Sequence, residues 1–131
     1  MARFHAALAC LAVIWFTAPA AATGTVACEA GESGAELLLT IGSLPVLSVV
    51  HMEFTDGEKT WSTSDSGDVA VVVGQAFRDG NRWLIDATDP NIEGVVGEIR
   101  LNEAVEGTSV ALAGTLRIAG SGAFAVTCIG P

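Results

Sequence analysis

The chain has 131 residues, with fifteen acidic side chains, six basic ones and a formal net charge of −9. This excess of negative charge repels nucleic-acid phosphates and anionic lipid headgroups, and it excludes a nucleic-acid-binding protein. The length suits a single domain around one hydrophobic core, and the sequence has no internal repeat or second domain boundary.

Residues 1–22 have the three parts of a secretory signal peptide. Arg3 precedes the apolar run Ala6–Phe16, and alternate alanines up to Ala22 supply the small residues of a cleavage site. The run is shorter than the roughly 20 residues that span a bilayer. We therefore predict cleavage after Ala22, an extracytoplasmic location in the periplasm or the medium, and no membrane span. A lipoprotein signal acylated at Cys10 is the alternative, although the apolar run continues past this cysteine.

Two cysteines, Cys28 and Cys128, remain in the single β domain predicted for residues 23–131. In an oxidising compartment two such thiols are expected to pair. Their distance along the chain lacks the close C-x-x-C spacing of redox pairs. The sequence therefore predicts a structural disulfide between the first and last strands.

Alternating apolar and polar residues, the pattern of a half-buried strand, recur along the rest of the chain. One predicted face holds Val50 with Met52 and Phe54, and another strand buries Phe77 together with the valines that precede it. Val110 is expected to be buried with the apolar residues up to Ile118. The strands predicted in chain order cover residues 25–29, 36–41, 46–55, 59–63, 68–78, 82–88, 95–102, 109–118 and 123–128.

Turn signals separate these strands. Asp79-Gly80 predicts a hairpin with a type I′ turn, and Asp56-Gly57 predicts a second turn. Residues 86–98 are expected to form the longest irregular connection between strands, with room for a helical turn. The prediction is an all-β fold: a single antiparallel β-sandwich or a small closed barrel of about eight strands, with its terminal strands joined by the disulfide.

The acidic segment after Trp83 is a candidate calcium site. Asp86, Asp89, Asn91 and Glu93 offer four oxygen-bearing side chains of the type that calcium binds. Their order does not match an EF-hand loop, and the alternative is a set of solvated turns. Calcium is therefore the one cofactor to consider, and otherwise we expect none.

The candidates for catalysis are few. His51 and Glu53 lie two residues apart on a predicted strand and would point the same way, which is the minimum geometry for a shared proton. No G-x-S-x-G elbow is present, and a serine triad would have to use His51 as its base. We therefore expect a protein that is not an enzyme, with a hydrolase as the less favoured alternative.

Binding is the more natural role for a rigid, disulfide-linked β domain. Trp61 beside the polar loop with Asp65 and Asp68 is the candidate binding surface, although a place for Trp61 in the core is an alternative. The sequence thus predicts a secreted or periplasmic binding or structural module for an unidentified protein or envelope component. The alternative is a carrier of a small ligand or of a divalent metal.

Overall fold

The computed structural model describes residues 23–131. Among these residues there is no helix long and apolar enough to cross a membrane. The predicted signal peptide, including Cys10 and the cleavage position, lies outside the described residues. The elements are β1 (Gly24–Glu29), η1 (Gly31–Ser33, a 3-10 turn), β2 (Glu36–Ile41), β3 (Val49–Thr55), β4 (Thr60–Ser62), β5 (Val69–Ala70), β6 (Val72–Asp79), β7 (Arg82–Thr88), β8 (Val95–Glu106), β9 (Ser109–Ile118) and β10 (Gly122–Ile129).

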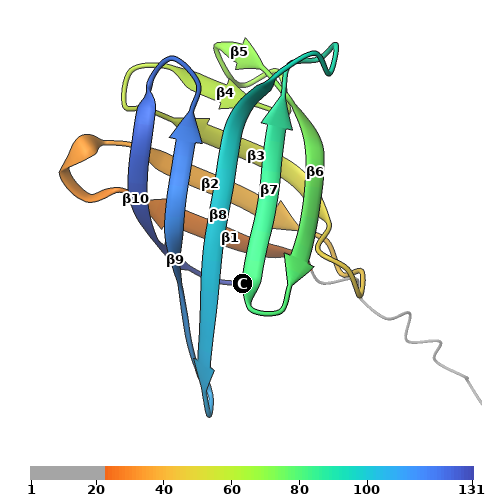
Figure 1. The fold of residues 1–131 in the computed structure, drawn as a ribbon, viewed down its shortest axis with the longest axis vertical. Helices are drawn as coiled ribbons and strands as arrows, with labels where there is room; N and C mark the ends of the chain where they lie inside the picture. Colours follow the sequence, from red (N-terminus) through yellow and green to blue (C-terminus); the bar gives the residue numbers. More distant parts are fainter. Residues whose placement is uncertain (1–22) are drawn as a thin grey trace, which may run out of the picture.

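All ten strands belong to one sheet, in the order β5-β4-β3-β2-β1-β10-β9-β8-β7-β6. Every neighbouring pair is antiparallel except β4 and β5, which run parallel. The sheet curls on itself so that β1, β2 and β3 cross behind the upright strands β6 to β10 (Figure 1). The predicted all-β fold is confirmed, as a nearly closed barrel with ten strands instead of about eight.

The predicted disulfide joins the terminal strands. Cys28 of β1 and Cys128 of β10 are direct partners across the antiparallel ladder, and their sulfur atoms are 2.02 Å apart. The two cysteines are separated by 100 positions in the sequence. The bond therefore links the two ends of the chain at the centre of the sheet.

The inward-facing side chains fill the barrel. Trp83, Phe54 and Ile85 are among the largest fully buried ones. The Phe54 ring lies over Gly97 of β8, so closely that a Cβ added at Gly97 would lie 2.8 Å from the Phe54 Cζ atom. The Trp61 ring stacks on the Phe54 ring, with the two ring centroids 5.6 Å apart. Buried apolar side chains from both halves of the sheet therefore fill the interior, as in other small barrels.

A bulge in β6 corrects the prediction that Phe77 is buried. The register of β6 against β7 shifts between Val73 and Gln75, so one extra residue separates the two halves of the strand. Such a shift exchanges the two faces. Phe77 is consequently 44 % exposed, and the Arg78 guanidinium instead lies 4.2 Å from the centroid of the buried Trp83 ring.

Two other residues predicted to be buried are exposed for local reasons. Val50 is 58 % exposed because it is the extra residue of a bulge, where His51 pairs with Thr40 but Val49 pairs with Ile41. Val110 is 59 % exposed although its strand continues the buried pattern. It pairs with Val105 beyond Asn102 and Leu112, the last residues of β8 and β9 that pair with β7 and β10. Here β8 and β9 extend past the other strands (Figure 1).

The loops also differ in detail from the predictions. In the β6–β7 hairpin Asp79 pairs with Arg82, so the two turn residues are Gly80 and Asn81. Only Gly80 has a positive φ, 61°, which fits a type II′ turn and not the type I′ turn predicted. The irregular connection expected at 86–98 is a loop of only six residues, because β7 continues to Thr88 and β8 begins at Val95.

One hydrogen bond connects two turns at the end of the barrel opposite the extension of β8 and β9 (Figure 1). Ser121, in the β9–β10 turn, donates its hydroxyl to Asp56 in the β3–β4 turn at 2.5 Å. This bond, with the backbone amides of Lys59 and Glu58, lowers the pKa of Asp56 from its usual 3.8 to about 2. The ionised carboxylate thus fastens two loops that are distant in sequence.

This geometry gives an expected pH dependence. A carboxyl whose folded-state pKa is depressed stabilises the fold above its unfolded pKa and ceases to do so as the pH falls through the folded value. Wild-type protein should therefore melt at a higher temperature than Ser121→Ala at pH 6, and the difference should shrink as the pH falls from about 3.8 to about 2. Ser43→Ala, at an exposed loop serine, is the control. A difference that does not change with pH would contradict this role.

Candidate functional site

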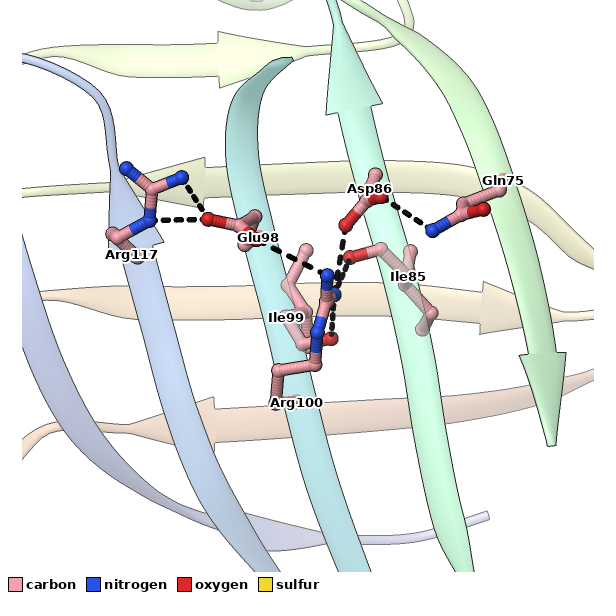
Figure 2. A network of polar contacts seen from close by, with 7 residues as sticks. All are labelled: Gln75, Ile85, Asp86, Glu98, Ile99, Arg100 and Arg117. Atoms are coloured by element: carbon pink, nitrogen blue, oxygen red, sulfur yellow. Dashed lines mark hydrogen bonds and ion pairs between the residues drawn. The ribbon is translucent and has the colours of Figure 1, made fainter. Parts of the chain in front are cut away.

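Asp86, the first candidate calcium ligand, belongs to a polar network on the outer face of the barrel. Its Oδ1 atom lies 2.7 Å from Nη1 of Arg100 on β8, an ion pair that falls outside hydrogen-bond geometry. Its Oδ2 atom accepts a hydrogen bond from the Gln75 side chain on β6. Figure 2 shows these contacts spanning neighbouring strands. Asp86 is therefore engaged by groups of its own sheet.

Arg100 is the centre of this network. Its Nη1 donates to the carbonyl oxygens of Ile85 and Ile99, at 3.0 and 2.9 Å, and its Nη2 donates to Glu98 at 3.2 Å. Glu98 is in turn paired with Arg117 of β9 (Figure 2). Two carboxylates and two guanidinium groups thus balance in charge across three strands. This arrangement stabilises the sheet and needs no added cation.

Replacement of Arg100, the cation at the centre of this network, is expected to lower the free energy of unfolding. Arg100→Met keeps the aliphatic stem but leaves Asp86, whose side chain is only 13 % exposed, without its ion pair. We expect a loss of roughly 1–3 kcal/mol in the free energy of unfolding, measured in urea. Arg82→Met, which breaks an ion pair exposed on both sides, is the control and should change it by less than about 1 kcal/mol. Equal losses for Arg100→Met and Arg82→Met would show that the burial of Asp86 does not add to the contribution of its ion pair.

Asp89 is occupied by its own loop. Its carboxylate accepts hydrogen bonds from the backbone amides of Gly94, Asn91 and Glu93, at 2.6, 2.9 and 3.0 Å. The bond from Gly94 is the main cause of the lowered pKa of Asp89, and the other two amides act in the same direction. Such a carboxylate closes a tight turn. Asn91 and Glu93 thus meet Asp89 through their main chains.

The same loop contains Ile92, whose φ is 60°. A β-branched residue is strained in the left-handed region by about 1–2 kcal/mol, whereas asparagine tolerates it. Ile92 is also 70 % exposed, so little apolar burial is lost on its replacement. Ile92→Asn is therefore expected to raise the free energy of unfolding by about 1 kcal/mol in urea denaturation. Ile92→Val, which is still β-branched, should give no gain.

The four candidate calcium ligands are thus divided between two structural roles. Asp86 is part of the strand network, and Asp89 closes the loop. Within residues 23–131 no group of three or more histidine, cysteine or acidic side chains is placed to hold a metal ion. The calcium site stays a prediction without support from this geometry.

The candidate binding residues near Trp61 are only partly at the surface. Trp61 is 7 % exposed, stacks on Phe54, and has the Lys59 ammonium 5.9 Å from its ring centroid. Asp68 accepts a hydrogen bond from the Thr60 amide at 2.9 Å, which fixes the loop that follows β4. Asp65 is exposed. The ring of Trp61 therefore contributes to the core and leaves the loop carboxylates as the exposed part of this surface.

His51 and Glu53 have separate partners. Nδ1 of His51 lies 3.1 Å from the Thr63 hydroxyl, and Glu53 accepts a hydrogen bond from Ser66 at 2.9 Å. Ser66 also contacts the buried Ser62 hydroxyl at 3.3 Å. These contacts hold the 62–68 loop against β3. They give the histidine no serine or acid to act with.

No protein-family model, curated protein or solved structure matches this chain.

One surface feature was missed by the sequence analysis. Exposed apolar side chains gather on the extension of β8 and β9, where Val105 and Val110 are both 59 % exposed. The alternation that predicted the strands gives no signal for it, because the segment Glu103-Ala104-Val105-Glu106 does not alternate. The extension therefore presents two exposed valines that are direct partners across the β8–β9 ladder.

Proposed function

We propose that this protein is an extracytoplasmic, non-enzymatic binding module that recognises a protein or envelope component with its outer surface. One observation supports this role above the others: the barrel interior is filled by its own side chains, with the Phe54 ring against Gly97. A module of this kind has its surface available for recognition. The disulfide at Cys28 and Cys128 fits an oxidising compartment.

The same observation ranks this role above a carrier of a small apolar molecule. A carrier barrel keeps a chamber for its ligand, whereas here large apolar side chains meet at the centre. For calcium, the favoured carboxylates already have partners in the chain, Arg100 for Asp86 and the loop amides for Asp89. Recognition at the surface is therefore the function that the geometry supports best.

Native mass spectrometry of the protein, purified gently from the cells that make it, tests this function. We expect a native complex with a second polypeptide, and a denatured spectrum with the bare disulfide-bonded chain. A small adduct released on denaturation would favour the carrier instead. A calcium titration is the complementary measurement, because an ion that binds the native state specifically must raise the melting temperature. A native spectrum with the bare chain alone would contradict the proposed function.

A further inference from the structure

A pocket of about 200 Å³ lies between the β2–β3 loop and the end of β6. Figure 1 shows the loop that follows β2 beside the arrowhead of β6. Leu47 of this loop is buried in the core, whereas Leu44 and Val46 are 62 % and 69 % exposed. Of the described residues that line the pocket, Arg78 alone has a polar side chain. The pocket therefore combines an apolar wall with one cation.

The Arg78 guanidinium has no hydrogen-bond acceptor among the described residues. Residues 23–131 contain four arginines, and the other three donate hydrogen bonds to carboxylates. The carboxylate paired with Arg78 is that of Glu103, whose Oε2 atom lies 3.6 Å from Nη2, too far for a hydrogen bond. A guanidinium has five N–H donors. An anionic group can therefore bind Arg78 without displacing an existing hydrogen bond.

The tryptophan in contact with Arg78 is a second donor without a partner. Trp83 is fully buried, and its Nε1 atom has no hydrogen-bond partner within the described part of the chain. The Cζ atom of Arg78 lies 4.2 Å from the centroid of the Trp83 ring, and this stacking orients the planar guanidinium. An arginine held in one orientation suits the two oxygen atoms of a carboxylate. The donors at this end of the barrel thus favour a carboxylate as ligand.

The size of the pocket indicates what carries this carboxylate. Pockets that enclose a whole small-molecule ligand usually measure about 300–1,000 Å³. A pocket of about 200 Å³ is smaller and suits a single apolar side chain. An apolar side chain next to a carboxylate, attached to a larger molecule, is the last residue of a polypeptide. Capture of a C-terminal carboxylate is a recurring mode of peptide recognition.

We propose that this pocket binds the C-terminal end of a partner polypeptide whose last residue is apolar. The terminal carboxylate pairs with Arg78, and the last side chain packs against Leu44 and Leu47. The inference rests on the proposed function and names the part of the partner that is recognised. The net charge of −9 makes the rest of the surface unfavourable for a carboxylate, so binding depends on Arg78.

Peptides that differ only at their C-terminal end are the first probe. Pools of fluorescein-labelled hexapeptides share randomised upstream positions and end in leucine with a free carboxylate, leucine with a carboxamide, or lysine with a free carboxylate. Fluorescence anisotropy with the oxidised protein measures their binding. We expect the leucine pool with the free carboxylate to bind tightest. Its affinity should exceed that of the carboxamide pool by about tenfold or more, because the charge-assisted pair with Arg78 is lost in the amide.

Variants of the charged groups test the role of Arg78. Arg78→Met keeps the aliphatic stem and should abolish the preference for a free carboxylate. Arg82→Met, at an arginine paired with Asp79 outside the pocket, should preserve this preference. Glu103→Gln removes the carboxylate that shares Arg78 and should strengthen binding of the free-carboxylate leucine pool. Cooperative thermal melting of each variant would show that it is folded.

A variant of the apolar wall tests the side-chain part of the site and does not depend on how Arg78→Met folds. Leu44→Ser replaces an exposed leucine and should weaken the leucine pool by about tenfold, with little effect on the lysine pool. Ile92→Ser is the matched control, because Ile92 is 70 % exposed and lies in the β7–β8 loop outside the pocket. It should change the affinity by less than about twofold.

The outcomes separate this inference from the proposed function. Equal binding of the carboxylate and carboxamide pools, or no binding of either, would overturn the C-terminal site and leave the binding module. A native complex with unchanged affinity in Arg78→Met would do the same. Octanoate that binds as tightly as the leucine pool would overturn the peptide in favour of a free carboxylic acid. The absence of any wild-type complex in native spectra would overturn the proposed function itself.

Discussion

Replacement of both Cys28 and Cys128 by alanine is expected to lower the free energy of unfolding by roughly 2–5 kcal/mol. The bond closes a loop that spans 100 positions, for which chain entropy alone gives about 4.7 kcal/mol. The effect arises in the unfolded chain, because the bond limits how far its two ends can separate. It is large against the total stability of about 5–15 kcal/mol that is usual for a domain.

Urea denaturation of the oxidised wild type, the reduced wild type and the double variant measures this effect. Reduction should bring the wild type close to the Cys28→Ala/Cys128→Ala variant and should leave that variant unchanged. The far-ultraviolet spectra should coincide, because β1 and β10 still pair. Equal stability of the oxidised and reduced wild type would contradict the expectation.

Phe54→Ala is expected to cost about 3–5 kcal/mol, the second of the large effects. Phe54 is 1 % exposed, stacks with Trp61, and fills the space over Gly97. Its truncation leaves a cavity that the surrounding strands can close only in part. Phe77→Ala is the matched control: that ring is 44 % exposed, so its loss should cost less than half as much. Similar losses at the two positions would mean that the interior is not packed as described.

The contact between Phe54 and Gly97 can be isolated by a double-mutant cycle. Gly97→Ala alone overpacks the interior, because its Cβ would lie 2.8 Å from Phe54 Cζ, and should cost about 1–3 kcal/mol. With Phe54→Leu in the same chain the added methyl group has room, so its cost should fall. Additive losses would indicate that the two residues do not share this space.

The sequence was sufficient to predict the β class, the disulfide and most of the strands, for a physical reason. Alternation indicates which side of a strand is buried, and Cys28 and Cys128 were the only two cysteines of the predicted β domain, so each had a single possible partner there. Bulges escape this reasoning because they depend on the partner strand. The extra residue in β6 exchanged Phe77 and Arg78, and that in β3 turned Val50 outward.

The candidate sites were less predictable than the fold. Asp86 and Asp89 are close in sequence and carry oxygen atoms of the type that calcium binds. Their residue type does not reveal that other groups of the folded chain already contact these carboxylates. Arg100 lies on the next strand, and its approach to Asp86 follows from the β7–β8 register. The exposure of Val110 likewise depends on where β10 ends, which its own alternation does not encode.

The place of β1 between β2 and β10 determines when folding can be completed. β2 follows β1 closely in the chain, but β10 is synthesised after all the other described strands. Until it arrives, β1 and β9 are open edges that can pair with other chains. Contacts this distant in sequence also form slowly. A chain built this way is best kept unfolded until β10 is available to pair with both β1 and β9.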